Sequence, residues 1–187
     1  MGWRNRGDFL ILPSMKKQTI CLVLAMLCLT ATAFAQEQTQ KQLHIYEGLN
    51  FGTTKSEYYK QFPEQRVVIN KYKYTFHPGF YKDSILTSLV IATDTMGVDS
   101  FKKVEMAMYN LSDLYTREFD KPGLYNKNIG PNKVLKGRFV LLTFWNIGPK
   151  YVPITLYRTK QDMYYATCKL ENKAFEASLA EADTKKD

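Results

Sequence analysis

One amphipathic stretch, residues 101–119, constrains the fold of this chain more than any other feature. Its apolar residues recur every three or four positions and form one stripe, while its charged residues lie on the other faces. The stripe consists of Phe101, Val104, Met108, Leu111 and Tyr115, widened by Ala107 and Leu114. Asp99 or Ser100 is expected to cap the first turn. Pro122 and Gly123 are expected to end the helix. A helix with one apolar face must pack on another layer of structure.

Alternating apolar segments predict the β-structure that this helix would cover. The expected strands are 67–69, 72–76, 85–92, 138–145, 152–158 and 163–170. A turn is expected at His77-Pro78-Gly79, and the short connections after residues 145 and 158 favour an antiparallel meander. Pro153 cannot donate a backbone hydrogen bond, so its strand is expected to begin there or to lie at a sheet edge. The sequence therefore predicts an α+β fold, with two helix-then-antiparallel-hairpin or meander units forming a two-layer helix-on-sheet domain.

A shorter helix is expected after Thr54. Thr54 and Glu57 fit a capping box, and Pro63 would end the helix about two turns later. The stretch Gly48-Leu-Asn-Phe-Gly-Thr-Thr-x-x-Glu57 places a short strand and a glycine turn before this capped helix and a hairpin after it. It resembles small exported bacterial domains of the SmpA/OmlA and β-lactamase-inhibitor-protein-like kind, over roughly residues 43–92, with 101–170 as a candidate second unit. The resemblance implies the fold and an envelope or extracellular setting. The family's usual lipobox and paired cysteines are missing from this sequence, and no partner or binding residue is carried over.

The N-terminus has the organisation of a secretory signal peptide. Met15-Lys16-Lys17 precedes an apolar run over residues 20–29, and Ala33-Phe34-Ala35 supplies a small-x-small cleavage site. The run is shorter than the roughly 20 apolar residues that a membrane span requires. We predict cleavage after Ala35, a periplasmic or extracellular location, and no transmembrane span in the mature chain. The residues before Met15 are interpreted as an upstream extension, with the true start left open between Met1 and Met15.

The mature chain is long enough for one domain with a core of its own. We expect a single α+β domain over residues 36–172, followed by a helix-prone, fraying tail over 173–187. Removing the leader lowers the net charge from +8 to +5, because four basic residues and one acidic residue leave with it. The remaining positive charge is spread thinly along the chain, which argues against a nucleic-acid partner. The oligomeric state is left open.

Cys168 is the one cysteine that remains in the mature sequence, so no intramolecular disulfide is expected. It alternates with Ala166 and Leu170, which indicates an apolar strand face. We predict a buried, inert thiol, with a reactive or intermolecular thiol as the alternative.

No catalytic, metal or cofactor motif is found in the sequence. His44 and His77 are 33 positions apart and neither has a partner at ligand spacing, so no metal site is expected. His44 is expected on the polar side of a strand, and His77 is expected in the turn that it forms with Pro78 and Gly79. There is no nucleophile elbow, phosphate-binding loop or placed carboxylate pair. We therefore predict a non-enzymatic protein without cofactors, and leave a hydrolase assembled from distant residues as a third alternative.

Tyrosine is abundant, and aromatic side chains are favoured at interfaces. The aromatic residues of 72–76 and 139–141 alternate as a core face does. Those in or beside expected turns are the candidate partner or ligand contacts: Phe80, Tyr81, Tyr125 and Tyr151.

Two binding functions fit these features. The leading hypothesis is an exported, non-catalytic binding protein of the bacterial cell envelope, whose partner is a protein or another envelope component. The partner would dock on a sheet face or on an edge such as 152–158, which could also pair with a second copy. The alternative is a pocket for a small apolar or glycan ligand. Its expected lining is Tyr72, Tyr74, Trp145 and Tyr157.

Overall fold

The computed structural model describes residue 36 and residues 39–126 and 129–185. The predicted signal peptide and its cleavage site after Ala35 lie outside these residues. Thr39–Asp187 forms one compact unit, distinct from Met1–Gln38, and this larger unit contains both sheets. None of the described helices is long and apolar enough to cross a membrane.

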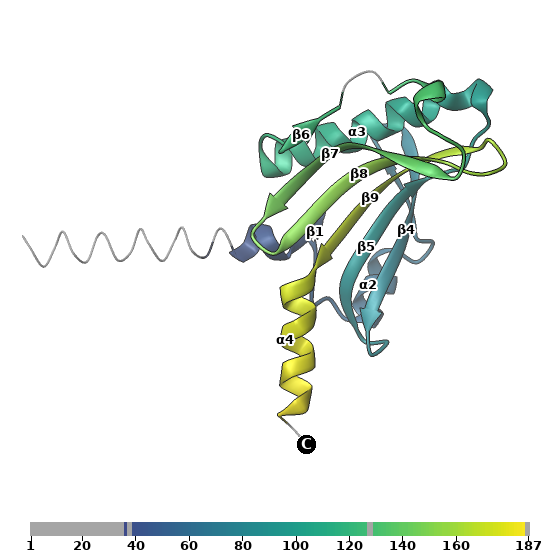
Figure 1. Cartoon of the computed structure of the whole chain (residues 1–187). Coiled ribbons are helices and arrows are strands. Elements are labelled where there is room, and N and C mark those ends of the chain that lie inside the picture. Colours follow the sequence, from purple (N-terminus) through teal and green to yellow (C-terminus); the bar gives the residue numbers. More distant parts are fainter. Residues whose placement is uncertain (1–35, 37–38, 127–128, 186–187) are drawn as a thin grey trace, which may run out of the picture. The chain divides into compact units, whose positions relative to one another are not determined.

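The main feature of the larger unit is an antiparallel sheet with the order β3-β4-β5-β9-β8-β7-β6 (Figure 1). Its strands are β3 Arg66–Ile69, β4 Tyr72–Tyr81, β5 Ile85–Thr93, β6 Leu124–Tyr125, β7 Arg138–Ile147, β8 Lys150–Arg158 and β9 Tyr164–Asn172. β5 and β9 pair in the middle of this order, where Leu89 lies opposite Leu170. A separate small sheet pairs β1 His44–Tyr46 with β2 Leu49–Asn50. Helices accompany these strands, so the predicted α+β class is confirmed.

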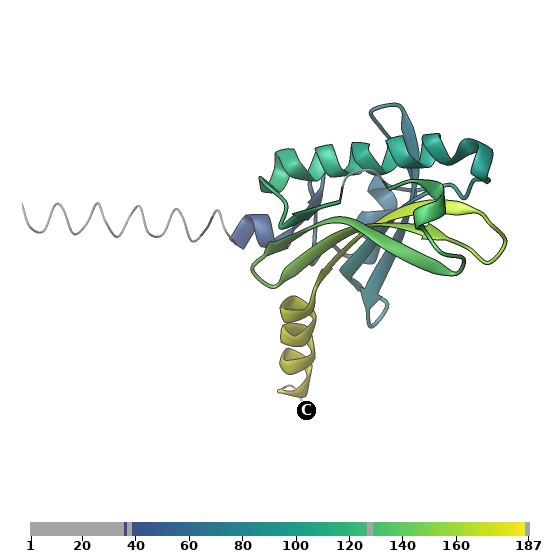
Figure 2. The same ribbon diagram turned by 45° about the horizontal axis from the view of Figure 1, so that its top comes forward.

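The long helix α3 occupies Phe101–Phe119, as the hydrophobic stripe predicts. Figure 2 shows it lying across one face of the sheet, where it contacts β5, β7, β8 and β9. The stripe is buried, and Val104, Met108 and Leu111 are fully inaccessible to solvent.

The start of α3 differs from the prediction, whereas the helix ends at Phe119, just ahead of Pro122 and Gly123, as predicted. The expected cap at Ser100 is wrong, because its side chain makes no capping hydrogen bond. A 3-10 turn, η1 Val98–Ser100, leads into the helix instead. The helix ends before Asp120, whose φ of 65° reverses the chain ahead of Pro122.

The strands contribute one apolar face to the core beneath α3. In β8 this face carries Val152, Ile154 and Leu156, all fully buried. Cys168 of β9 is also fully buried, as predicted, and its burial raises the pKa of the thiol. A thiol in this setting stays protonated at neutral pH, which disfavours nucleophilic chemistry.

Two expectations about prolines and turns are wrong. His77-Pro78-Gly79 lies inside β4, and the chain reverses after Tyr81 instead. Gly79 allows β4 to lie close to the Ser88 side chain of β5, because a Cβ at this position would lie only 2.2 Å from the Ser88 Oγ. The reversal uses Lys82 and Asp83, whose φ angles of 45° and 56° suit a tight hairpin turn.

The second correction concerns β8, which lies between β7 and β9 and not at an edge. Pro153 is tolerated there because the β8–β9 ladder is interrupted around it. Tyr151 pairs with Glu171 and Ile154 pairs with Cys168, but the residues between them are not paired. Pro153 therefore falls in an interruption of that ladder, where no backbone donor is needed. The edges of the sheet are β3 and β6.

The short helix α2 Lys55–Gln61 begins with the predicted capping box and ends before Pro63. The Glu57 N–H donates to the Thr54 Oγ1 at 3.3 Å, and the Thr54 N–H donates to the Glu57 Oε2 at 3.0 Å. The hydrogen bond from the Thr54 side chain also lowers the pKa of the Glu57 carboxyl.

Thr54→Ala is expected to lower the free energy of unfolding by about 1 kcal/mol, because it leaves a first-turn N–H without its acceptor. Urea denaturation followed by circular dichroism measures the change. Thr54→Ser retains the hydroxyl and should keep most of the stability. Equal losses in the two variants would contradict the capping role.

The C-terminal helix α4 occupies Lys173–Thr184, in the segment predicted to be helix-prone, and runs on from β9 (Figure 1). The Asn172 side chain caps it by accepting from the Phe175 N–H at 3.0 Å. No residue of α4 is buried. Its attachments include the Phe175 ring, 6.4 Å from that of Phe51, and the Asp183 carboxylate, 2.7 Å from the Lys82 ammonium. The expected fraying of this tail stays a prediction.

Candidate functional site

The sheet face opposite α3 carries a row of aromatic side chains. Strand alternation directs every second residue of β7, β8 and β9 to this face. Phe139 lies opposite Tyr157, and Tyr157 lies opposite Tyr165, so the row crosses three adjacent strands. Within the part of the chain that the structure describes, no helix lies over this face (Figure 2). Phe144 and Tyr151 add a second pair on β7 and β8, and we call these five residues the aromatic face.

The rings of the aromatic face pack on one another. The Tyr157 and Tyr165 rings are stacked with centroids 4.9 Å apart and an interplanar angle of 6°. Phe139 tilts against Tyr157 at 5.4 Å, and Phe144 lies 5.6 Å from Tyr151. Phe139 is 59% exposed and Tyr151 is 38% exposed. Such cross-strand aromatic pairs stabilise a sheet, and they also form a preassembled apolar surface.

The stacking decides which chemistry this surface can present. In this stack Tyr157 and Tyr165 each cover one face of the other ring, and Phe139 tilts against Tyr157. Burial raises the pKa of Tyr165, so its hydroxyl stays protonated and able to donate. The surface therefore presents aromatic rings, tyrosine hydroxyls and an exposed Phe139, which are residue types enriched at protein interfaces.

The structure does not bring the four sequence-predicted contact residues together. Tyr151 belongs to the aromatic face, and Tyr125 lies on the edge strand β6, where it is 39% exposed. Phe80 lies within β4 and packs against the rings of Tyr58 and Tyr59 on α2. The Tyr81 hydroxyl donates to Asp183 of α4 at 3.1 Å. Phe80 and Tyr81 therefore hold the two shorter helices against the sheet.

The prediction that Phe139 and Leu141 form a core face is wrong. Leu142 is the buried residue of this segment, and the register with β8 shifts between Leu141 and Thr143. Both faces of the sequence Phe139-Val-Leu-Leu142 are apolar, so alternation alone could not tell which side is covered. The alternation in β8 does distinguish the two faces of the sheet. Its aliphatic residues face the core, while Tyr151 and Tyr157 lie on the other face.

The expected pocket lined by Tyr72, Tyr74, Trp145 and Tyr157 is also wrong. Tyr74 and Trp145 are buried in the core, and the Trp145 indole donates to the Asp120 carbonyl at 3.0 Å. Tyr157 lies on the aromatic face. Tyr72 lines a hollow beside the first turns of α3, and Tyr74 borders a different one at the β3 edge of the sheet.

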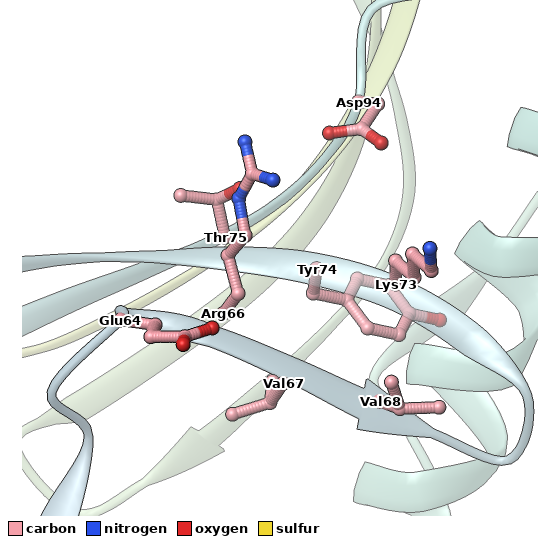
Figure 3. Close-up of a pocket in the computed structure, with 8 residues that line it drawn as sticks. All are labelled: Glu64, Arg66, Val67, Val68, Lys73, Tyr74, Thr75 and Asp94. Atoms are coloured by element: carbon pink, nitrogen blue, oxygen red, sulfur yellow. The ribbon is translucent and has the colours of Figure 1, made fainter.

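A second hollow of about 290 Å³ lies at the β3 edge of the sheet (Figure 3). Its lining residues are Glu64, Arg66, Val67, Val68, Lys73, Tyr74, Thr75 and Asp94. Arg66 and Thr75 are register partners on β3 and β4, and they extend to the side on which Asp94 lies. The lining contains acidic and basic residues as well as two valines. Figure 3 shows that its polar groups do not converge on one point.

A buried hydrogen-bond network fastens the β3–β4 hairpin to α3. The Asn110 side-chain amide donates to the Tyr74 hydroxyl at 2.9 Å and to the Ile69 carbonyl at 3.1 Å. The Tyr74 hydroxyl donates to the Ala107 carbonyl at 2.8 Å, and the Asn70 amide donates to the Asn110 Oδ1 at 2.9 Å. Because buried polar groups are costly without partners, this network fixes the hairpin on the helix.

Asn110→Ala is expected to lower the free energy of unfolding by about 1–3 kcal/mol, since it removes the donor to a buried carbonyl and a buried hydroxyl. Backbone amides of β3 and β4 should also exchange with deuterium faster than those of β8. Asp113→Ala, on the exposed side of α3, is the control and should change neither quantity. Unchanged exchange of the hairpin in Asn110→Ala would contradict the fastening role.

The two histidines are placed differently from one another. His44 is half-buried in β1, and its Nε2 lies 3.3 Å from the Glu118 carboxylate of α3. His77 lies in β4, which corrects its expected place in a turn. Among the residues that the structure describes, no group of three or more His, Cys, Asp or Glu side chains could hold a metal ion.

A buried lysine was missed by sequence reasoning. Lys150 is fully inaccessible, and its ammonium donates to the carbonyls of Lys41 and His44, the latter at 2.7 Å. It also lies 4.1 Å from the centroid of the Phe119 ring. Burial lowers the pKa of Lys150 to about 8, although the nearby Glu118 carboxylate opposes this. The sequence gives no sign of this burial, because Lys150 lies beside an expected hairpin loop, where lysine side chains are usually exposed.

Comparisons of this chain with models of known protein families, with curated proteins and with solved structures gave no match.

Proposed function

We propose that the protein is an exported, non-catalytic binding protein of the bacterial cell envelope that recognises a protein partner through the aromatic face. The organisation of residues 15–35 as a signal peptide supports export to the periplasm or the cell exterior. The aromatic face is the single observation that supports the binding role, because it is preassembled, partly exposed and opposite the covered face of the sheet.

The composition of this surface supports a protein partner. Aromatic residues supply large contact areas at low entropic cost, and a few of them carry most of the energy of a typical interface. Phe139 and Tyr151 are the most exposed members and would be the first to lose water on docking. The stacked pair Tyr157 and Tyr165 would remain a rigid floor.

Site-specific photocrosslinking in the native bacterium tests the proposal. Benzoylphenylalanine replaces Phe139 or Tyr151, and the adducts are identified by mass spectrometry. The matched control replaces Val98, which is also exposed but lies in η1, away from the aromatic face. We expect the same partner at both test positions and no adduct at Val98.

A Phe139→Ser/Tyr151→Ser double variant should reduce recovery of that partner at least tenfold, since each truncation at an interface centre costs about 1–2 kcal/mol. Circular dichroism checks that the variant is folded. Repeated recovery of no partner, or equal adducts at all three positions, would count against the proposal.

The layout of the chain supports a further, finer proposal about its architecture. The helix α2 is followed by β3, β4 and β5, and the helix α3 is followed, after β6, by β7, β8 and β9. We propose that these are two units of one design, as in the small exported domains that residues 48–57 resemble.

A small-ligand function is the second candidate. It is favoured by a separate observation, a hollow between the sheet and the first turns of α3.

A further inference from the structure

A groove of about 510 Å³ lies between the β3–β4 hairpin, the end of β5 and the first turns of α3. Its apolar lining comes from Tyr72, Met96, Val104 and Ala107. Val104 and Ala107 are buried, while Tyr72 and Met96 are half-exposed. The volume is in the range of roughly 300–1,000 Å³ that small-molecule sites occupy. A flexible Met side chain lets such a wall adapt to ligand shape.

Three lysines surround this apolar lining. Lys71 and Lys73 come from the hairpin, Lys103 comes from α3, and one carboxylate, Asp94, accompanies them. Among the described residues none of these lysines forms an ion pair, whereas the neighbouring Lys102 ammonium lies 2.6 Å from Glu105. The three lysines outnumber the one carboxylate of the lining, so the groove has an excess of positive charge.

The groove is also held in shape. Asn110 ties Asn70 and the Ile69 carbonyl to α3, so the hairpin bearing Lys71 and Lys73 is fixed against the helix. Asn70 and Lys71 have φ angles of 46° and 71°, which makes a tight two-residue turn. A site whose walls are fixed in advance loses little entropy on binding.

We propose that this groove binds a small amphipathic anion, with its apolar body against Met96 and Val104 and its carboxylate or phosphate near the three lysines. The apolar lining removes hydrocarbon from water, and the unpaired ammonium groups supply charge-assisted hydrogen bonds. The ligand is a free molecule in solution and not a lipid within a bilayer, since the apolar lining is recessed below an exposed rim. This site is separate from the aromatic face and does not depend on it.

Methyl NMR of the purified protein, with ¹³C-labelled methionine, tests the proposal. The probes are dodecanoate and dodecyltrimethylammonium, which share a chain length and differ in headgroup charge, each below its micelle concentration. Dodecanoate should shift the Met96 methyl signal and bind at least tenfold more tightly than the cation. Met106, exposed on α3 outside the groove, is the internal control and should not move. The signals are assigned with Met96→Leu and Met106→Leu.

Charge variants make the test specific. Lys71→Gln/Lys73→Gln/Lys103→Gln should weaken dodecanoate binding at least tenfold. Lys60→Gln/Lys121→Gln/Lys160→Gln removes the same charge from other exposed positions and should weaken it less than twofold. Equal binding of the two probes, equal loss in the two triple variants, or a Met106 shift as large as that of Met96 would overturn the proposal. Binding to phosphatidylglycerol vesicles without any binding of free dodecanoate would also overturn it, in favour of a membrane surface.

Discussion

Met108→Ala is expected to lower the free energy of unfolding by about 2–5 kcal/mol. Met108 lies in the middle of the α3 stripe and is fully buried between the helix and the sheet. Truncating it loses the transfer energy of three heavy atoms and leaves a cavity that close-packed neighbours fill only in part. Urea or thermal denaturation followed by circular dichroism measures the loss.

Met106→Ala provides a matched control two positions away in the same helix. Its side chain is 42% exposed, so the same truncation should change the free energy of unfolding by less than about 0.5 kcal/mol. Alanine is also the better helix former, which offsets a small loss of contact at this site. Similar losses in the two variants would show that α3 does not bury the face that carries Met108.

The second large effect is a pH dependence of stability that originates in Lys150. Burial lowers its pKa from 10.5 to about 8 in the folded protein. Below pH 8 the lysine is protonated in both states, and the folded state bears the full cost of the buried charge. Between pH 8 and 10.5 the folded state loses the proton first, so the unfolded state binds more protons and the free energy of unfolding rises with pH. The rise attributable to Lys150 is about 3 kcal/mol across this range.

Other buried groups act in the opposite direction and must be separated from Lys150. Burial raises the pKa of the Cys168 thiol and of tyrosines such as Tyr74 and Tyr115. These groups lose their protons first in the unfolded state, so they reduce stability above about pH 9.

Comparison with Lys150→Met isolates the lysine. The thiol and the tyrosines are present in both proteins, so their contributions cancel in the difference between the two free energies of unfolding. This difference, natural protein minus Lys150→Met, should increase between pH 7 and 10.5. Urea denaturation at half-unit pH intervals measures this difference. Lys160→Met, at an exposed site, should give a curve parallel to that of the natural protein. A difference that stays constant with pH would mean that Lys150 does not titrate in this range.

Much of the framework could be predicted from local patterns. The stripe of α3, the capping box of Thr54 and Glu57, and the burial of Cys168 all follow from periodicity or from residues close in sequence. Each depends on neighbours within a few positions, so one sequence contains the needed information.

The candidate sites could not be predicted in the same way. Phe139, Tyr157 and Tyr165 come from three strands, and they form a row only because the registers of β7, β8 and β9 align them. Both faces of β7 are apolar, so the sequence does not show which one α3 covers. The choice is made by the bulge after Leu141, which directs Leu142 into the core.

The sequence by itself determined the α+β class, the position and apolar face of the long helix and the capped start of the short one, because these arise from contacts within a helical turn or a strand. Only the tertiary structure decided that β8 lies inside the sheet and that Lys150 is buried against His44, more than a hundred positions earlier. It also brought the lysines of a hairpin beside a lysine of α3. These arrangements depend on strand order and on long-range packing, which local periodicity does not encode.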